Sequence, residues 1–254
     1  MIYLTGDLHG TYDIKKLNKS NFPDQKEMCK DDYLIILGDF GLIWNVDGES
    51  KEETYWLDWL QEKKFTTLFI DGNHENFDRL NSFPVEEWHG GKIHRIRPSV
   101  LHLMRGQVFD IDGLKCFTFG GAQSNDISDG ILDLSKEADR QKYHKLRKDP
   151  FSMYRILGVS WWKEELPDPA EYEEGQRNLE ANDFKVDMVL THCCATSTQV
   201  MVSGGMKSAN AETDFFEELK SKLDFGKWYF GHYHVDRVAN SKEICMYNEI
   251  SRVW

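Results

Sequence analysis

The chain has 254 residues, of which 40% are hydrophobic and 29% charged, as in an ordinary soluble protein. That length can bury a substantial core, in one large α/β domain or in two small ones. Its 31 basic and 43 acidic residues give a net charge of −12. This balance disfavours an extended nucleic-acid surface, because phosphate backbones bind to basic faces.

Nothing in the sequence predicts export or a membrane span. No apolar run approaches the roughly 20 residues that cross a bilayer, and the strand-like Ile2–Thr5 comes first, with no export signal before it. The cysteines are odd in number and lack CxxC spacing, so reduced thiols in a cytoplasmic protein are expected: Cys29, Cys116, Cys193, Cys194 and Cys245. The oligomeric state stays open.

The first third of the chain alternates strand and helix patterns. Apolar strands are expected at Ile2–Thr5, Asp31–Leu37 and Thr66–Asp71. Helices are expected between them at Tyr12–Lys19 and Lys51–Lys64, the second with its aromatic residues on one face. This order predicts βαβ units and a parallel sheet.

Four shorter strands follow without helices between them, which favours an antiparallel portion of a second sheet: Ile93–Arg97, Val100–Arg105, Gln107–Ile111 and Leu114–Phe119. Beyond them, a charged helix is expected at Ser135–Lys148, and the acidic run Glu164–Asp183 fits a solvated helix face. The last expected elements are strands at Val186–Leu190 and Lys227–Phe230, a helix at Phe215–Leu223, and a strand or pair within Cys245–Val253. With no repeat or linker, residues 1–254 are expected to form one domain, with an inserted cap or lid at about 123–185.

Metal-ligand residues follow apolar strands in five places: Gly6-Asp7-Leu8-His9-Gly10, Gly38-Asp39-Phe40-Gly41, Gly72-Asn73-His74-Glu75, Thr191-His192 and Gly231-His232-Tyr233-His234. Loops at the carboxyl ends of strands gather in one crevice of an α/β sheet. Seven side chains there are too many for one tetrahedral ion: Asp7, His9, Asp39, Asn73, His192, His232 and His234. They fit two metals that share a carboxylate, and the mixed N and O donors favour Mn, Fe, Zn, Co or Ni over calcium or structural zinc. Such a pair generates hydroxide near neutral pH and clamps a phosphoryl group for in-line attack.

These five ordered blocks resemble the calcineurin-like metallophosphoesterase superfamily. Two further stretches resemble a bacterial and phage-type branch of uncharacterised phosphoesterases: Gly120-Gly121-Ala122-x-Ser124, and Ser160-Trp161-Trp162 with Glu164-Glu165. The resemblance implies a four-layer α/β/β/α sandwich of two mixed sheets. It implies that Asp7, His9 and His234 hold one metal, that Asn73, His192 and His232 hold the other, and that Asp39 bridges them. It also places His74 outside the coordination sphere, near the leaving oxygen, where a proton donor helps the departing alkoxide. Glu75 is expected to orient a histidine or cap the following helix.

The second block departs from the protein phosphatases of this superfamily, because it lacks their phosphate-binding arginine. Arg155, Arg140 and Arg79 are the candidates to replace it, since a guanidinium matches phosphate oxygens. Asn73 and Arg155 are the expected substrate contacts. Three tryptophans are expected to pack, with pocket lining as the alternative: Trp44, Trp161 and Trp162. Structural roles are expected for Cys193, Cys194, His89, His94, His102 and His144.

The sequence therefore predicts a phosphoesterase with two divalent cations, manganese first among them, that hydrolyses a phosphate mono- or diester by attack of a metal-bridging hydroxide. Asp39 and His74 are the expected catalytic residues. A small phosphorylated substrate is favoured over nucleic acid only because acidic residues outnumber basic ones in the chain. A nuclease is the nearer alternative, and a non-catalytic scaffold the more distant one, because the histidines of the site are all present.

Overall fold

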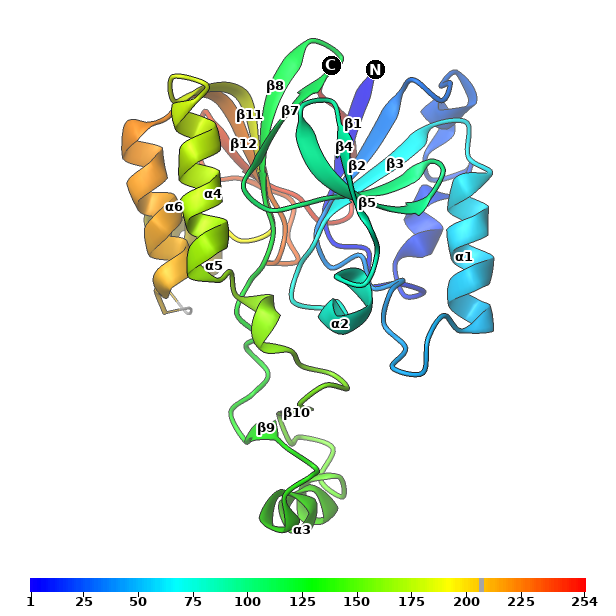
Figure 1. Cartoon of the computed structure of the whole chain (residues 1–254), viewed down its shortest axis with the longest axis vertical. Coiled ribbons are helices and arrows are strands. Elements are labelled where there is room, and N and C mark those ends of the chain that lie inside the picture. Colours follow the sequence, from blue (N-terminus) through cyan, green and yellow to red (C-terminus); the bar gives the residue numbers. More distant parts are fainter. Residues whose placement is uncertain (206–207) are drawn as a thin grey trace.

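A computed structural model describes residues 1–205 and 208–254, which form two mixed sheets packed face to face and flanked by helices (Figure 1). The first sheet has the order β15-β1-β2-β3-β6-β5-β4. Its strands are β1 (Ile2–Thr5), β2 (Tyr33–Leu37), β3 (Thr66–Ile70), β4 (Val85–Trp88), β5 (Gly91–Arg97), β6 (Val100–Leu103) and β15 (Ile250–Arg252). The second sheet has the order β13-β14-β12-β11-β8-β7. Its strands are β7 (Gln107–Ile111), β8 (Leu114–Phe119), β11 (Lys185–Thr191), β12 (Asp224–Phe230), β13 (Arg237–Val238) and β14 (Glu243–Cys245).

Helices cover the outer face of each sheet and complete a four-layer α/β/β/α sandwich, which confirms the predicted fold class. Beside the first sheet lie η1 (Ile14–Leu17), η2 (Pro23–Lys26), α1 (Lys51–Gln61) and α2 (Phe77–Leu80) (Figure 1). Beside the second lie α4 (Pro169–Glu180), α5 (Thr196–Ser203) and α6 (Ala211–Lys222). No helix in the described part of the chain is long and apolar enough to span a bilayer.

The alternation of side chains along each strand explains the layering. On β2, Leu34 and Ile36 pack with α1, whereas Ile35 and Leu37 pack between the two sheets. Successive strand residues point to opposite faces, so a strand that is apolar throughout requires cover on both sides. The strand patterns therefore specify an internal sheet with a helix on one side and a second sheet on the other.

Three expectations differ in the structure. The four short strands do not share one sheet, because β5 and β6 extend the first sheet while β7 and β8 belong to the second. The chain crosses at Gly106, which has φ 71° and lies so close to α4 that a Cβ would stand 2.7 Å from the backbone of Gly175. The helix expected at Tyr12–Lys19 is reduced to turns and η1. The expected C-terminal pair exists, but β14 and β15 lie in different sheets.

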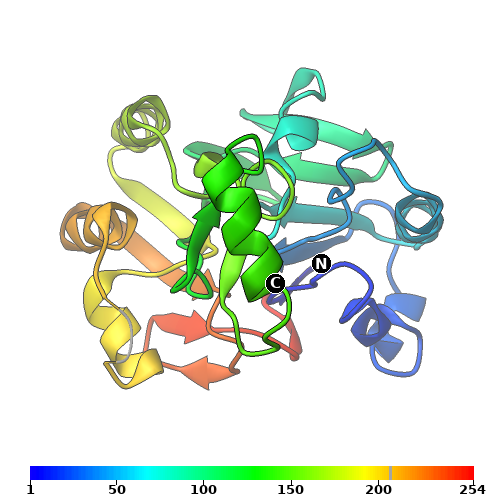
Figure 2. The same cartoon turned by 90° about the horizontal axis from the view of Figure 1, so that it is seen from below.

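Residues 126–160 project from the sandwich, and we call this segment the arm (Figure 1). It contains β9 (Gly130–Leu132), α3 (Glu137–Leu146) and β10 (Tyr154–Ile156), with β9 and β10 paired in parallel. Seen from below, α3 lies in front of the middle of the sandwich (Figure 2). The rest of the segment expected to form a cap returns to the body as η3 (Lys163–Glu165) and α4.

Candidate metal centre

The predicted ligand residues meet at one edge of the sandwich, where the parallel strands of both sheets end. Asp7, Asp39 and Asn73 follow β1, β2 and β3, which are parallel neighbours. His192 follows β11 and His232 follows β12, also parallel neighbours. Parallel strands place their carboxyl ends on one side of a sheet, and the two sheets present these ends together.

Four of these residues have a left-handed backbone: His9 (φ 46°), Asp39 (φ 45°), His232 (φ 66°) and His234 (φ 49°). Residues other than glycine rarely adopt this conformation, and it persists where the surrounding structure enforces it. The strained positions coincide with the side chains that converge on the centre. The loop geometry therefore supports a functional site.

The first half of the centre contains Asp7, His9, Asp39 and His234, whose candidate ligand atoms all lie within 4.8 Å of one another. Asp7 Oδ2 is 3.1 Å from His234 Nε2, and Asp39 Oδ2 is 3.3 Å from His9 Nε2. His9 Nδ1 lies 2.7 Å from the carboxylate of Asp13. That contact places the ring proton on Nδ1 and leaves Nε2 as a donor for a metal.

The second half lies on the other side of Asp39. His192 is fully buried, and its Nδ1 donates to the carbonyl of Leu37 at 2.7 Å, so that Nε2 points inward, 3.3 Å from Asp39 Oδ1. Asn73 Oδ1 and His192 Nε2 are buried and have no hydrogen-bond partner among the described residues. The ring of His232 is 5.1 Å from that of His192. Buried polar atoms of this kind require a partner, and a divalent cation with N and O ligands satisfies both.

The electrostatics also favour a cation at this point. Burial alone would lower the pKa of His192, but the neighbouring carboxylate of Asp39 outweighs it and raises that pKa to about 10. In turn, His192 and His74 hold the pKa of Asp39 well below its usual range, against the effect of burial. The carboxylates thus attract positive charge, which a proton supplies when no metal is bound. The donor set fits two divalent cations, with Asp39 between them.

A hydrogen-bonded chain fixes the amide of Asn73. Its Nδ2 donates to Ser124 Oγ at 3.4 Å, and that hydroxyl lies 2.5 Å from Glu165 Oε2. The other carboxylate oxygen of Glu165 accepts from the amide nitrogen of Ser124 at 3.0 Å. Because all three side chains are buried, the chain directs Nδ2 of Asn73 toward Ser124 and leaves Oδ1 for a metal.

His74 stands at the rim of the centre. Its backbone nitrogen donates to Asp39 Oδ1 at 2.8 Å, whereas its Nε2 is 3.9 Å from Asp39 Oδ2. Burial, together with the nearby Arg155, lowers the pKa of His74. Within the described structure, the carboxylate of Glu75 bonds neither to α2 nor to a histidine, contrary to expectation. It accepts from the amides of Phe40 and Gly41, and so holds the loop after Asp39. Asn76 caps α2 instead.

Of the three arginines considered as phosphate ligands, Arg155 lies at the centre. It reaches from β10 to within 3.2 Å of His74 Nε2, and Asp126 and the carbonyl of Ser160 hold its guanidinium. Arg79 instead pairs with Glu53 beneath the loop, and Arg140 pairs with Glu137 on α3. Of the three arginines, Arg155 is the one that lies beside the predicted site residues.

A cleft of about 1110 Å³ opens over the centre, lined by His9, His74, His234, Arg155, Trp44 and Tyr247. The ring of Trp44 lies 6.0 Å from that of His74, so this tryptophan forms a wall of the cleft. Trp162 is buried behind Trp44 and donates to Asp78 at 2.8 Å, as expected of a packing residue. The cleft has room for a substrate larger than a phosphate group.

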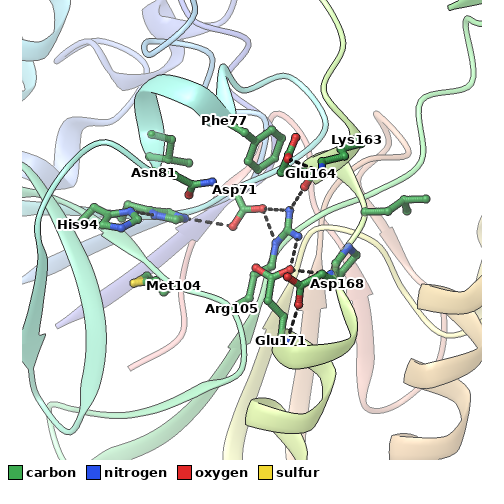
Figure 3. A pocket seen from close by; sticks show the side chains of 14 residues that line it. Asp71, Phe77, Asn81, His94, Met104, Arg105, Lys163, Glu164, Asp168 and Glu171 are labelled. Carbon is green, nitrogen blue, oxygen red and sulfur yellow. Dashed lines mark hydrogen bonds and ion pairs between the residues drawn. The ribbon is translucent and has the colours of Figure 1, made fainter. Parts of the chain in front are cut away.

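A second group of buried charges supports the loop from behind (Figure 3). Asp71, which directly precedes the Asn73 loop, accepts from both Nε and Nη2 of Arg105, at 2.8 and 2.6 Å. His102 Nε2 lies 3.1 Å from the same carboxylate, and His94 stacks beside His102. These side chains line a separate cavity of about 340 Å³. The histidines thus pack around a buried ion pair, away from the metal ligands.

Several residues that support the site were not among those predicted from the sequence to act there. Ser124, Glu165, Asp71 and Arg105 come from separate segments and meet only in the folded chain. Lys16 is a further example: its Nζ donates to the carbonyls of Gly6, Asp7 and Tyr247, which ties the first ligand loop to the loop before β15. The sequence held one usable signal, namely charged residues within otherwise apolar segments.

Comparisons with known proteins agree with this geometry. The family model for calcineurin-like phosphoesterases matches residues 1–236. Over 171 residues the chain is 26% identical to lariat debranching enzyme A of Xenopus laevis, covering 61% of this chain and 30% of that protein. It is equally similar to the lariat debranching enzyme of Danio rerio, covering 28% of that protein. The chain thus matches less than a third of the length of either relative.

Proposed function

We propose that this chain, which belongs to the calcineurin-like phosphoesterase family, hydrolyses a phosphate mono- or diester with the help of two divalent cations. Family membership supports a phosphoesterase, and the converging ligand set supports the metal dependence. The observation that carries the proposal is the pair of histidines whose Nδ1 atoms are engaged by Asp13 and by the carbonyl of Leu37. Both rings thereby present Nε2 to the shared carboxylate of Asp39.

We assign one metal to Asp7, His9 and His234 and the other to Asn73, His192 and His232, with Asp39 between them. Bound there, two divalent cations would supply a hydroxide nucleophile near neutral pH and neutralise the phosphoryl oxygens. Manganese is the first metal to test, followed by Fe, Zn, Ni and Co, because affinity order alone does not determine which metal a cell supplies.

The protein's own side chains would orient and protonate the substrate. Arg155 points its guanidinium into the cleft beside His74, where it can bind a non-bridging phosphate oxygen. His74 stands outside the ligand group, with Nε2 3.9 Å from Asp39 Oδ2 and accepting from Arg155. Once a substrate phosphate replaces His74 as the partner of Arg155, Nε2 can carry the proton that is given to the leaving oxygen. Trp44 offers a flat surface to a planar leaving group.

The test is a substrate screen on metal-free protein reconstituted separately with Mn²⁺, Fe²⁺, Ni²⁺, Co²⁺ or Zn²⁺. We expect hydrolysis of p-nitrophenyl phosphate or bis(p-nitrophenyl) phosphate with at least one metal. Asp39→Asn should lose bound metal, whereas His74→Ala should keep its metal and lose about 10²- to 10⁴-fold in rate. Absence of hydrolysis with every metal, in protein shown to contain the metal, would refute the enzymatic function.

A further inference from the structure

One stretch of the arm, residues 140–148, is basic although the chain is acidic overall, and we call it the basic tip. Asp139 and Asp149 flank it. From Arg140 to Lys148 there are five basic residues and no acidic one, against a net charge of −12 for the whole chain. All five are exposed: Arg140, Lys142, Lys145, Arg147 and Lys148. The net charge alone conceals this distribution, because local potential and not total charge determines where a polyanion binds.

Most of these charges have no carboxylate partner within the described structure, although Arg147 lies over the ring of Tyr143. Arg140 pairs with Glu137, but no carboxylate lies within ion-pair distance of Lys142, Lys145, Arg147 or Lys148 among the residues described. A helix dipole favours a cation in the last turn, which does not account for five in nine residues. Because α3 buries none of its residues, the fold does not require these cations.

The basic tip is joined to the catalytic cleft by direct contacts. Tyr143 of α3 packs edge-on against Tyr154 of β10 at 5.8 Å, and Tyr154 lines the cleft over the metal centre. The next residue, Arg155, contacts His74. A ligand that runs along α3 would therefore be led into the cleft.

Exposed aromatic side chains accompany the charges. Phe151, at the turn between α3 and β10, is 87% exposed, and Tyr12, on the cleft rim, is 88% exposed. Phe151 therefore offers a stacking platform for an unpaired base close to the basic tip, and Tyr12 offers a second one at the cleft. A membrane surface would be met by a continuous apolar face, whereas α3 presents charged residues all round.

We infer that the arm binds single-stranded nucleic acid and delivers one of its phosphodiesters to the metal centre. The inference rests on the proposed function and replaces the small substrate expected from net charge with a polymeric diester. The cations of residues 140–148 would bind the backbone phosphates on one side of the scissile bond, as sequence-independent contacts do. An unpaired strand is flexible enough to bend from α3 into the cleft, and its bases are free to stack on the exposed rings.

The experiment compares two variants that lose the same charge. The arm variant replaces Lys142, Lys145, Arg147 and Lys148 with Gln. The control variant replaces Lys115, Lys185, Lys222 and Lys227 with Gln, which are exposed residues of the second-sheet side, outside the arm and the cleft. Binding of labelled single-stranded DNA and RNA is followed by fluorescence anisotropy over a salt series, on a manganese-loaded His74→Ala background to prevent cleavage.

We expect the arm variant to bind either strand about tenfold or more weakly than the control variant. Each lost phosphate contact contributes about 0.7 to the slope of log Kd against log salt, so the slope should fall by about 3. With His74 restored, both variants should hydrolyse bis(p-nitrophenyl) phosphate at the wild-type rate. Only the arm variant should lose cleavage of single strands.

Three results would overturn the inference. The arm variant and the control variant could bind single strands equally well, or the protein without arm substitutions could bind no single strands. The arm could also bind phosphatidylglycerol vesicles in place of nucleic acid. Each leaves the proposed function intact when bis(p-nitrophenyl) phosphate is still hydrolysed. Loss of that reaction in the wild-type protein would instead refute the proposed function, while the anisotropy result would still report on the arm.

Discussion

The guanidinium of Arg155 lies 3.2 Å from Nε2 of His74. An arginine side chain only donates hydrogen bonds, so His74 accepts at Nε2 and carries its ring proton at Nδ1. Asp126 binds the same guanidinium through Nε and Nη2, at 2.9 and 2.8 Å. Arg155 therefore joins the arm to the catalytic rim, and Asp126 fixes the orientation of its guanidinium.

Replacing Arg155 with Ala should lower kcat/KM on the best diester by about 10- to 100-fold, the effect of losing a charged hydrogen bond. Metal content should not change, because Arg155 is not a ligand. Arg140→Ala removes an arginine that lies on α3 and pairs with Glu137, so hydrolysis of a small diester should stay at the wild-type level. An unchanged kcat/KM in Arg155→Ala would remove this residue from the substrate site.

Ser124→Ala should weaken metal binding without touching a ligand. The change frees Nδ2 of Asn73 and leaves Glu165 buried without its hydroxyl partner. Loss of such a supporting contact typically costs 10- to 100-fold in metal affinity. Titration calorimetry should show the loss at one of two sites, and Ser124→Thr, which keeps the hydroxyl, should restore it. Two unaltered sites in Ser124→Ala would exclude the positioning role.

The ion pair of Arg105 and Asp71 should be costly to break. Both side chains are buried, and the Coulomb attraction between them lowers the pKa of Asp71 against the effect of burial. Removing Arg105 leaves an uncompensated buried charge, a loss of about 3–5 kcal/mol in the free energy of unfolding. Urea unfolding of Arg105→Met measures this loss. Arg95→Met, which breaks an exposed pair with Glu86, should cost less than about 1 kcal/mol.

Glu212 should make the metal-free protein less stable as the pH rises. It is fully buried, neither carboxylate oxygen has a hydrogen-bond partner in the described structure, and burial raises its pKa to about 8. The unfolded chain loses this proton near pH 4.5 and the folded chain near pH 8, so stability falls between these values. Glu212→Gln should flatten that slope in urea unfolding measured in a chelator. A slope equal to that of the wild type would show that Glu212 is already ionised in the fold.

The sequence predicted many of the strands and the ligand loops because both depend on local order, whereas the four layers were expected from the family resemblance. An apolar run such as Tyr33–Leu37 indicates a buried strand, and a polar residue directly after it lies at the sheet edge. The sequence showed which residues form strands, but it did not show which strands pair with each other. The four short strands after residue 90 divide between two sheets at Gly106, and this crossing depends on a close approach to α4 that no local pattern encodes.

The supporting residues of the site could not be predicted for a related reason. Ser124 and Glu165 lie 41 residues apart, and Asp71 and Arg105 lie 34 apart. A lone serine or glutamate has no periodicity to reveal its partner. The assignments of the individual metal ligands, of His74 and of Arg155 stay predictions that the experiments above can decide.

The pairing of β1 with β15 joins Tyr3 to Arg252, and the metal centre likewise joins Asp7 to His234. Contacts between such distant parts of a chain form slowly, because a long loop must close before they yield any stabilisation. The ligand set is therefore complete only after both sheets have docked. Uptake of a spectroscopically visible metal such as Co²⁺ during refolding would consequently mark the last step of folding. The bound metal would then stabilise the folded state, in which the two ends of the chain lie together.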